Sequence, residues 1–171
     1  MPTNSEWRVA YAKQARSDLY AREALLEDAK LPECHQLHFL QMACEKICKA
    51  HLCGQGTDPE SLQSSHAYIA KVLPIIVRQQ FANESSHSPK DRSWMIGAIR
   101  KLARKIELLA PSVKGGGAHP ANCEYPWVKP DGNLQVPVEY NFQINLLYEE
   151  AGRHLIKALY TAAEDLIRPE S

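Results

Sequence analysis

Apolar residues recur at steps of three and four positions over most of the chain, a spacing that places side chains on one face of an α-helix. The clearest case is residues 34–52, whose predicted buried face carries Leu37, Leu40, Cys44, Ile47, Cys48 and His51. Glu45 and Lys49 are expected to pair across one turn on the opposite, solvated side. Gly54 is expected to end this helix.

Start and stop signals mark further helices. Thr3 and Glu6 have the spacing of a capping box, which predicts a first helix beginning there. A third helix is expected to begin near Ser65 and to be kinked or broken at Pro74, because proline removes a backbone hydrogen bond and clashes with the preceding turn. Residues 75–81 would then continue as a second short helix.

Two more helices follow in the second half of the chain. The sequence Ser88-Pro89 predicts a helix start, and apolar residues continue at helical spacing to Leu109. Residues 110–139 hold several prolines and glycines, and the apolar residues on both sides of 130–132 predict a small hairpin or an ordered turn. The last helix is expected from about Asn141 to Ile167. The sequence therefore predicts one all-α domain over residues 1–171, an up-and-down bundle of about five helices with one long loop before the last.

Composition narrows the function classes. The 171 residues carry a formal net charge of +0, so binding to nucleic acid, membranes or acidic proteins would need a local patch. We see no secretory signal and no apolar run long enough to cross a bilayer. The five cysteines are then expected to be free thiols in a reducing compartment. These features predict a cytoplasmic protein that does not associate with membranes.

Several short motifs occur in an order that resembles a known family. They are Ala15-Arg-Ser-Asp-Leu19 with Leu25-Leu26, Gln41 to Ala50, Ser65-His66 with Leu73-Pro74, and Asn122 to Pro126. Together they resemble the HEPN (higher eukaryotes and prokaryotes nucleotide-binding) domain family of small helical nucleases, toxins and nucleotidyltransferase partners. The resemblance implies a helical homodimer that binds RNA, a nucleotide or a partner protein such as a nucleotidyltransferase, in a toxin–antitoxin or defence setting.

Family members that cleave RNA carry an arginine followed four to six residues later by a histidine, and this chain lacks that pair. A histidine can move the proton of the 2′-hydroxyl, and an arginine can stabilise charge on the phosphate. Three hypotheses therefore remain: a binding or regulatory module, a metal-independent ribonuclease with a rearranged site, and a purely structural partner subunit. His119, Tyr125 and Arg153 are the candidates for a rearranged site, although such loop residues more often make structural hydrogen bonds.

Two other groups of residues are candidates for chemistry. Cys44, Cys48 and His51 have a spacing at which zinc can be bound, but they share the face of Leu40 and Ile47, so the pattern favours core packing. We expect no metal and no cofactor. Arg92, Arg100 and Arg104, here called the basic strip, are separated by multiples of four, and Lys101 adjoins them. They are either a binding site for a phosphate or an acidic partner, or a solvated helix face.

Overall fold

The computed structural model describes residues 2–63, 67–83, 89–111 and 121–168, which are mainly α-helical. The described helices are α1 (Asn4–Leu26), α2 (Glu33–Gly54), α3 (Pro59–Gln63), α4 (Ile69–Asn83), α5 (Pro89–Glu107) and α6 (Glu150–Ile167). Between α5 and α6 lie the strands β1 (Trp127–Val128) and β2 (Leu134–Gln135) and the 3-10 turns η1 (Pro137–Glu139) and η2 (Asn145–Leu147). The predicted all-α bundle is confirmed, and so is the small antiparallel hairpin before the last helix.

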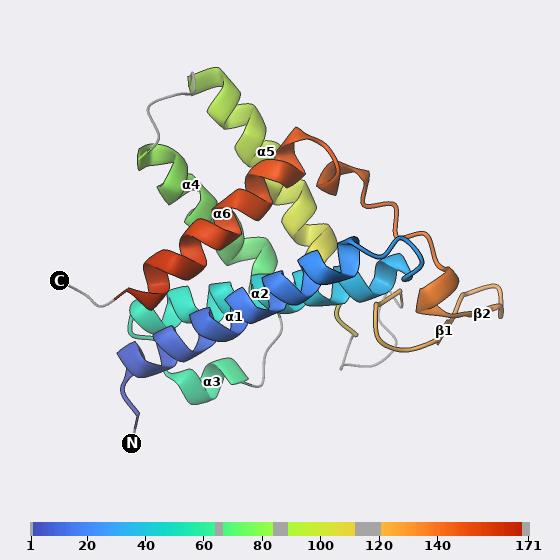
Figure 1. Cartoon of the computed structure of the whole chain (residues 1–171), viewed down its shortest axis with the longest axis horizontal. Helices are drawn as coiled ribbons and strands as arrows, with labels where there is room; N and C mark the ends of the chain where they lie inside the picture. The colour runs from blue at the N-terminus through green and yellow to red at the C-terminus, as the bar shows by residue number, and fades with distance from the viewer. Residues whose placement is uncertain (1, 64–66, 84–88, 112–120, 169–171) are drawn as a thin grey trace.

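Helix α2 is the centre of the bundle, since it contacts α1, α4, α5 and α6. Figure 1 shows α1 and α2 lying along one another, with α4, α5 and α6 arranged across them and both chain termini at one end. One contiguous core contains Leu40 and Ile47 of α2 together with Leu73, Ile99 and Leu155 from its neighbours. Because neighbouring elements cover α2 on several sides, some of its polar and charged side chains are also buried.

The pair formed by Glu45 and Lys49 lies inside the protein, so its predicted position on the solvated side of α2 was wrong. The two charged groups are 2.7 Å apart, and their side chains are only 7% and 6% exposed. The Glu45 carboxylate also accepts a hydrogen bond from the amide of Gln41 at 3.0 Å. The prediction failed because α4, α5 and the loop after α5 cover the side of α2 that the spacing alone left open.

The helix starts predicted at Thr3 and at Pro89 are confirmed, whereas Ser65, where a third helix was expected to begin, lies outside the described residues. The Thr3 hydroxyl accepts a hydrogen bond from the Glu6 amide at 3.2 Å, and the Glu6 carboxylate accepts one from the Thr3 amide at 2.7 Å. This is the capping box, which satisfies two backbone donors at the start of α1. Pro89 is the first residue of α5, where its missing N–H leaves no bond unmade.

Helix α4 continues through Pro74, so the predicted break into two short helices was wrong. The bond that Pro74 cannot make is the one to the carbonyl of Ala70, in the first turn of the helix. Val72 already donates to Tyr68 one turn earlier, at 2.9 Å. The proline thus removes one bond at the beginning of α4, and the chain after it remains helical to Asn83.

The last helix begins at Glu150, nine residues later than predicted from the sequence. The side chain of Asn141 accepts a hydrogen bond from the Gln143 amide at 2.9 Å, and Gln143 has a left-handed backbone with φ 50°. Lys105 of α5 then donates to the Gln143 carbonyl at 2.7 Å. This local turn competes with helix formation, as asparagine side chains often do.

Aromatic packing fixes the hairpin against the bundle. The ring of Tyr140 makes edge-to-face contacts with Trp127, at 4.8 Å between centroids, and with Phe142, at 5.0 Å. Gly132 has φ +85°, which the turn between the strands needs and which favours glycine. Among the described helices, none is both long and apolar enough to cross a membrane.

Candidate functional site

Four basic side chains meet in a groove between α4 and α5. Lys71 and Arg78 come from α4, and Arg100 and Arg104 come from α5. The groove has a volume of about 210 Å³, and Ala70, Pro74 and Ile75 also line it. We call the surface formed by these four cations and three apolar residues the basic groove.

Helix geometry explains why these side chains converge. Arg100 and Arg104 are one turn apart on α5, and Lys71 and Arg78 are two turns apart on α4, so each pair lies on one face of its helix. The two helices pack side by side through apolar residues that include Val72, Ile76 and Ile99. Packing of these apolar faces brings the two basic pairs to the same surface.

None of the four groove cations forms an ion pair in the part of the chain that the structure describes. The nearest acidic residue on α5 is Glu107, whose carboxylate accepts a hydrogen bond from the Ala70 amide at 3.1 Å and so caps the first turn of α4. Clustered like charges repel one another. An anion in the groove would relieve that repulsion and accept hydrogen bonds from both arginines.

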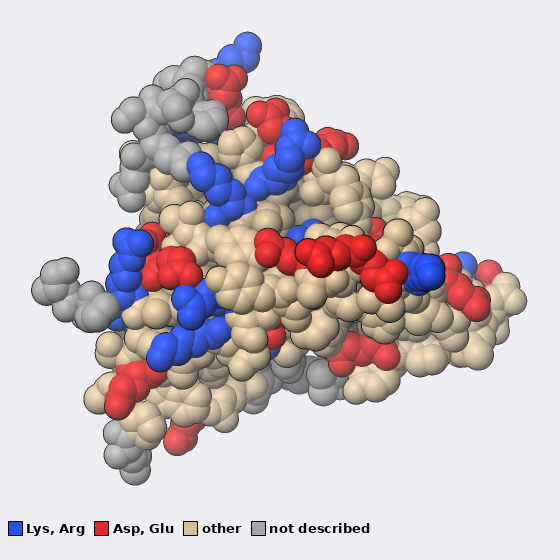
Figure 2. Space-filling view, viewed as in Figure 1, with Lys and Arg blue, Asp and Glu red and all other residues tan. Residues whose placement is uncertain are grey.

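The rest of the surface places this cluster in context. Figure 2 shows lysines and arginines on the pictured face in small groups, with separate groups of acidic side chains between them. This agrees with the formal net charge of +0 and leaves no single-sign field over that face. Any attraction for an anion must therefore come from local groups such as the basic groove.

The predicted basic residues do not all lie together. Arg100 and Arg104 line the groove, whereas Lys101 faces a neighbouring hollow that it lines with Lys90 and Trp94. Arg92 is half-buried near the start of α5 and lines neither of these two surfaces. The sequence patterns did not single out Lys71 and Arg78. Their two-turn spacing on an otherwise apolar helix was the available signal, because it places both on one exposed face of α4.

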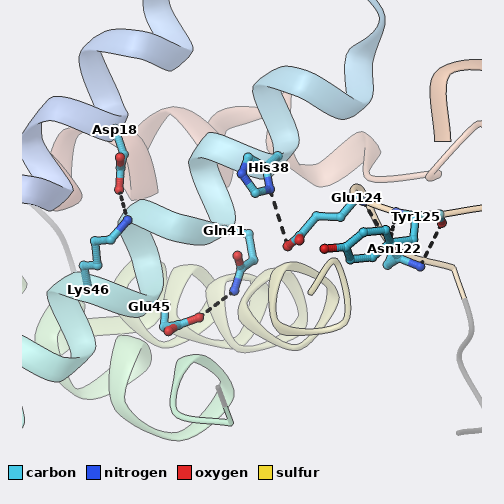
Figure 3. A network of polar contacts seen from close by, with 8 residues as sticks. All are labelled: Asp18, His38, Gln41, Glu45, Lys46, Asn122, Glu124 and Tyr125. Atoms are coloured by element: carbon cyan, nitrogen blue, oxygen red, sulfur yellow. Dashed lines mark hydrogen bonds and ion pairs between the residues drawn. The ribbon is translucent and has the colours of Figure 1, made fainter. Parts of the chain in front are cut away.

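A second cavity of about 350 Å³ lies between α2 and the loop after α5. Gln41, Met42 and Glu45 of α2 form one wall, and Glu124 and Tyr125 form the opposite one. Figure 3 shows Glu124 and Tyr125 extending from the loop toward Gln41, with Glu124 3.6 Å from His38. Along the same helix, Lys46 forms an ion pair with Asp18 of α1 at 2.5 Å.

Asn122 holds Tyr125 in place at this cavity. Its side-chain oxygen accepts hydrogen bonds from the amides of Glu124, at 2.9 Å, and of Tyr125, at 2.7 Å, while its amide group donates to the Tyr125 carbonyl at 3.2 Å. The tyrosine side chain nevertheless remains 60% exposed. This arrangement fixes the backbone and leaves the ring at the mouth of the cavity.

The candidate catalytic set is dispersed over the described structure. Tyr125 lines the cavity beside α2, while Arg153 lies in the first turns of α6 and lines neither this cavity nor the basic groove. His119 lies outside the described residues. The structure therefore does not bring Tyr125 and Arg153 to one cavity.

The cysteines of α2 occupy the core face, as expected. Cys44 and Cys48 are fully buried, and burial raises the pKa of the Cys44 thiol to about 12 and that of Cys48 well above its usual value. Burial also lowers the pKa of His51. Within the described residues no group of three or more histidine, cysteine or acidic side chains is arranged to hold a metal. The two thiols pack in the apolar core as small buried hydrophobic groups.

Comparison with known proteins adds no external guide to this chemistry. No protein-family model, no curated protein and no solved structure matches the chain. The HEPN resemblance accordingly stays a prediction from short motifs. The unpaired cations of the basic groove, which form the most charged of the described hollows, are therefore the best indication of function.

Proposed function

We propose that the protein is a binding module that holds a phosphate-bearing ligand, RNA or a nucleotide, in the basic groove. The observation that carries this proposal is the convergence of Lys71, Arg78, Arg100 and Arg104 without a carboxylate partner among the described residues. Arginine binds phosphate oxygens through paired N–H donors, and lysine adds a compact charge. The groove has the size for a phosphate group and its immediate neighbours, not for a whole duplex.

The HEPN resemblance supports a wider version of the proposal. In that version the protein is a cytoplasmic homodimer with a regulatory role, in a toxin–antitoxin or defence setting, that also contacts a partner protein such as a nucleotidyltransferase. The chain lacks the Arg-x(4–6)-His pair of the ribonuclease members. This absence favours binding over RNA cleavage as the main activity. The structural partner subunit remains the alternative if no phosphate-bearing ligand binds.

Charge reversal in the groove tests the proposal. Binding of a fluorescein-labelled 12-residue oligouridylate would be followed by anisotropy at several salt concentrations. The double variant Arg100→Glu/Arg104→Glu should bind weakly, and the dependence of log affinity on log salt should become shallower by roughly 0.7 for each phosphate that the variant no longer holds. The exposed positions of both arginines leave the core unchanged.

A matched control carries the same change in net charge elsewhere. Lys13 is exposed on α1 and Lys30 is exposed in the turn that follows it. The variant Lys13→Glu/Lys30→Glu should bind like the unmodified protein once salt is at physiological concentration, since long-range effects are then screened. Equal weakening in both double variants would show that net charge, and not the groove, governs binding. No binding by the unmodified protein even at low salt would overturn the proposal.

A further inference from the structure

A hollow larger than the basic groove lies on α5, on the face next to that groove. It has a volume of about 510 Å³, and its lining includes Lys90, Trp94, Gly97 and Lys101 of α5 together with Leu146 of η2. We call this surface the Trp94 hollow. The indole side chain is 58% exposed, which is unusual for a tryptophan in a protein with a well-packed core.

The spacing of these residues aligns them along the helix. Successive residues of an α-helix are about 100° apart, so Lys90, Trp94, Gly97 and Lys101 fall within roughly 60° of one another. The two lysines flank the tryptophan over about 16 Å at 1.5 Å per residue. A side-chain carbon at Gly97 would meet no atom within 4 Å, so the space beside the indole ring is open.

The hollow and the basic groove adjoin one another on the same helix. Arg100 directly precedes Lys101, and Arg104 lies about 60° from Lys101 around the helix axis. The two surfaces together present an exposed aromatic ring and six basic side chains, Lys71, Lys90, Arg78, Arg100, Lys101 and Arg104. Neither Lys90 nor Lys101 forms an ion pair among the described residues.

From this combination we infer that α5 binds single-stranded nucleic acid, with a base stacked on Trp94 and the adjoining phosphates on Lys90, Lys101 and the basic groove. The inference rests on the proposed function and specifies its ligand class. A flat aromatic ring beside a row of cations is the arrangement that binds unpaired bases without reading their sequence. A duplex keeps the faces of its bases stacked inside, so its bases are not available to Trp94.

The test separates stacking from charge. Anisotropy would be measured with three labelled probes, a 12-residue oligouridylate, the DNA strand of equal length and a 12-base-pair RNA duplex. Trp94→Ala should weaken binding of both single strands by roughly ten-fold to a hundred-fold, whereas Trp94→Phe should retain most of it. The salt dependence should stay unchanged in both variants, because every cation that holds a phosphate is still present. Tyr20→Ala, at another exposed aromatic residue, should bind like the unmodified protein.

Each outcome bears on one of the two proposals. Unchanged single-strand affinity in Trp94→Ala would overturn the stacking inference, while weaker binding by Arg100→Glu/Arg104→Glu would still support the groove as a phosphate site. Duplex binding as tight as single-strand binding would overturn single-strand selectivity alone. If Trp94→Ala left affinity intact but lowered the mass measured by light scattering, the hollow would be a protein interface and the inference would be wrong.

Discussion

The Lys49 ammonium group lies 2.7 Å from the Glu45 carboxylate in a part of α2 that solvent barely reaches. Gln41, one turn before Glu45, donates to the second carboxylate oxygen at 3.0 Å. A buried ion pair of this kind gains Coulomb energy but loses the hydration of both ions, so its net contribution to stability is small. Removal of one partner is different, because the other charge is then left in the core.

We predict that Lys49→Met lowers the free energy of unfolding by about 3–5 kcal/mol, since the buried ion pair with the Glu45 carboxylate, 2.7 Å long, would be broken. The double variant Lys49→Met/Glu45→Leu removes both charges and should recover most of that stability. Urea denaturation followed by circular dichroism measures both. If the double variant were as unstable as the single one, the loss of stability would come from altered side-chain packing and not from a buried charge left without Lys49.

Gly152 allows the start of α6 to approach the turn before it. A side-chain carbon at this position would lie 1.8 Å from the Leu147 carbonyl oxygen, so Gly152→Ala must displace backbone. We expect a decrease of about 2 kcal/mol or more in stability, which thermal unfolding would detect. Gly97→Ala is the matched control, because it meets open space in the middle of α5 and should stabilise the helix by roughly 0.5–1 kcal/mol.

Alkaline pH should destabilise the protein through its buried thiols. Burial raises the pKa of Cys44 from 9.0 to about 12, so between these values the unfolded chain has lost a proton that the folded chain still holds. Stability should therefore be unaffected by this thiol below pH 9 and should fall as the pH rises above it. Cys44→Ala should make that decline shallower, at the expense of a small void in the core.

The same cysteine variant tests the expectation that α2 binds no metal. Elemental analysis of protein purified without added metal should find no zinc in the unmodified chain or in Cys44→Ala. One zinc per chain that disappears in the variant would contradict the expectation and would assign the instability of the variant to metal release.

His119→Ala distinguishes the binding module from the ribonuclease hypothesis. A binding module should keep its affinity for the oligouridylate and should show no cleavage before or after the change. An enzyme that uses His119 as acid or base should lose on the order of a hundred-fold or more in cleavage rate while still binding RNA. Gel analysis of the labelled probe measures cleavage, and anisotropy measures binding on the same samples.

The homodimer is a separate expectation from the family resemblance. Multi-angle light scattering at micromolar concentration should give twice the 19.3 kDa mass of the chain. A two-fold contact would bury the same surface on both copies, so the dimer should dissociate on dilution in a single step. A monomer mass at every concentration would contradict it.

Prediction from sequence succeeded where local chemistry decides the structure. The capping box of Thr3 and Glu6, the proline start of α5 and the turn at Gly132 depend on neighbours within a few residues. It failed at the turn of Asn141, which delays the start of α6, and where tertiary packing determines the structure. The side of α2 that carries Glu45 and Lys49 is polar in sequence but covered in the fold, and the chain remains helical through Pro74.

The candidate site divides in the same way. Arg100 and Arg104 share a face of one helix, and the helical repeat is sufficient to group them. Lys71 and Arg78 join them only because α4 packs beside α5, an arrangement that no spacing within either helix encodes. Two of the four groove cations could thus be grouped from the helical repeat of the sequence. The other two could be assigned to the groove only from the tertiary structure.

The five cysteines, all free and all buried, also give the protein a set of internal reporters of its motions. A thiol that solvent cannot reach reacts with an alkylating reagent only while the segment around it is transiently open. Cys44 and Cys48 lie in the middle of α2, Cys34 and Cys53 near its two ends, and Cys123 in the loop that carries Tyr125. Their separate labelling rates would rank the free energies of local opening along the central helix. A ligand that raises these free energies would slow the labelling, so its effect could be measured without an added probe.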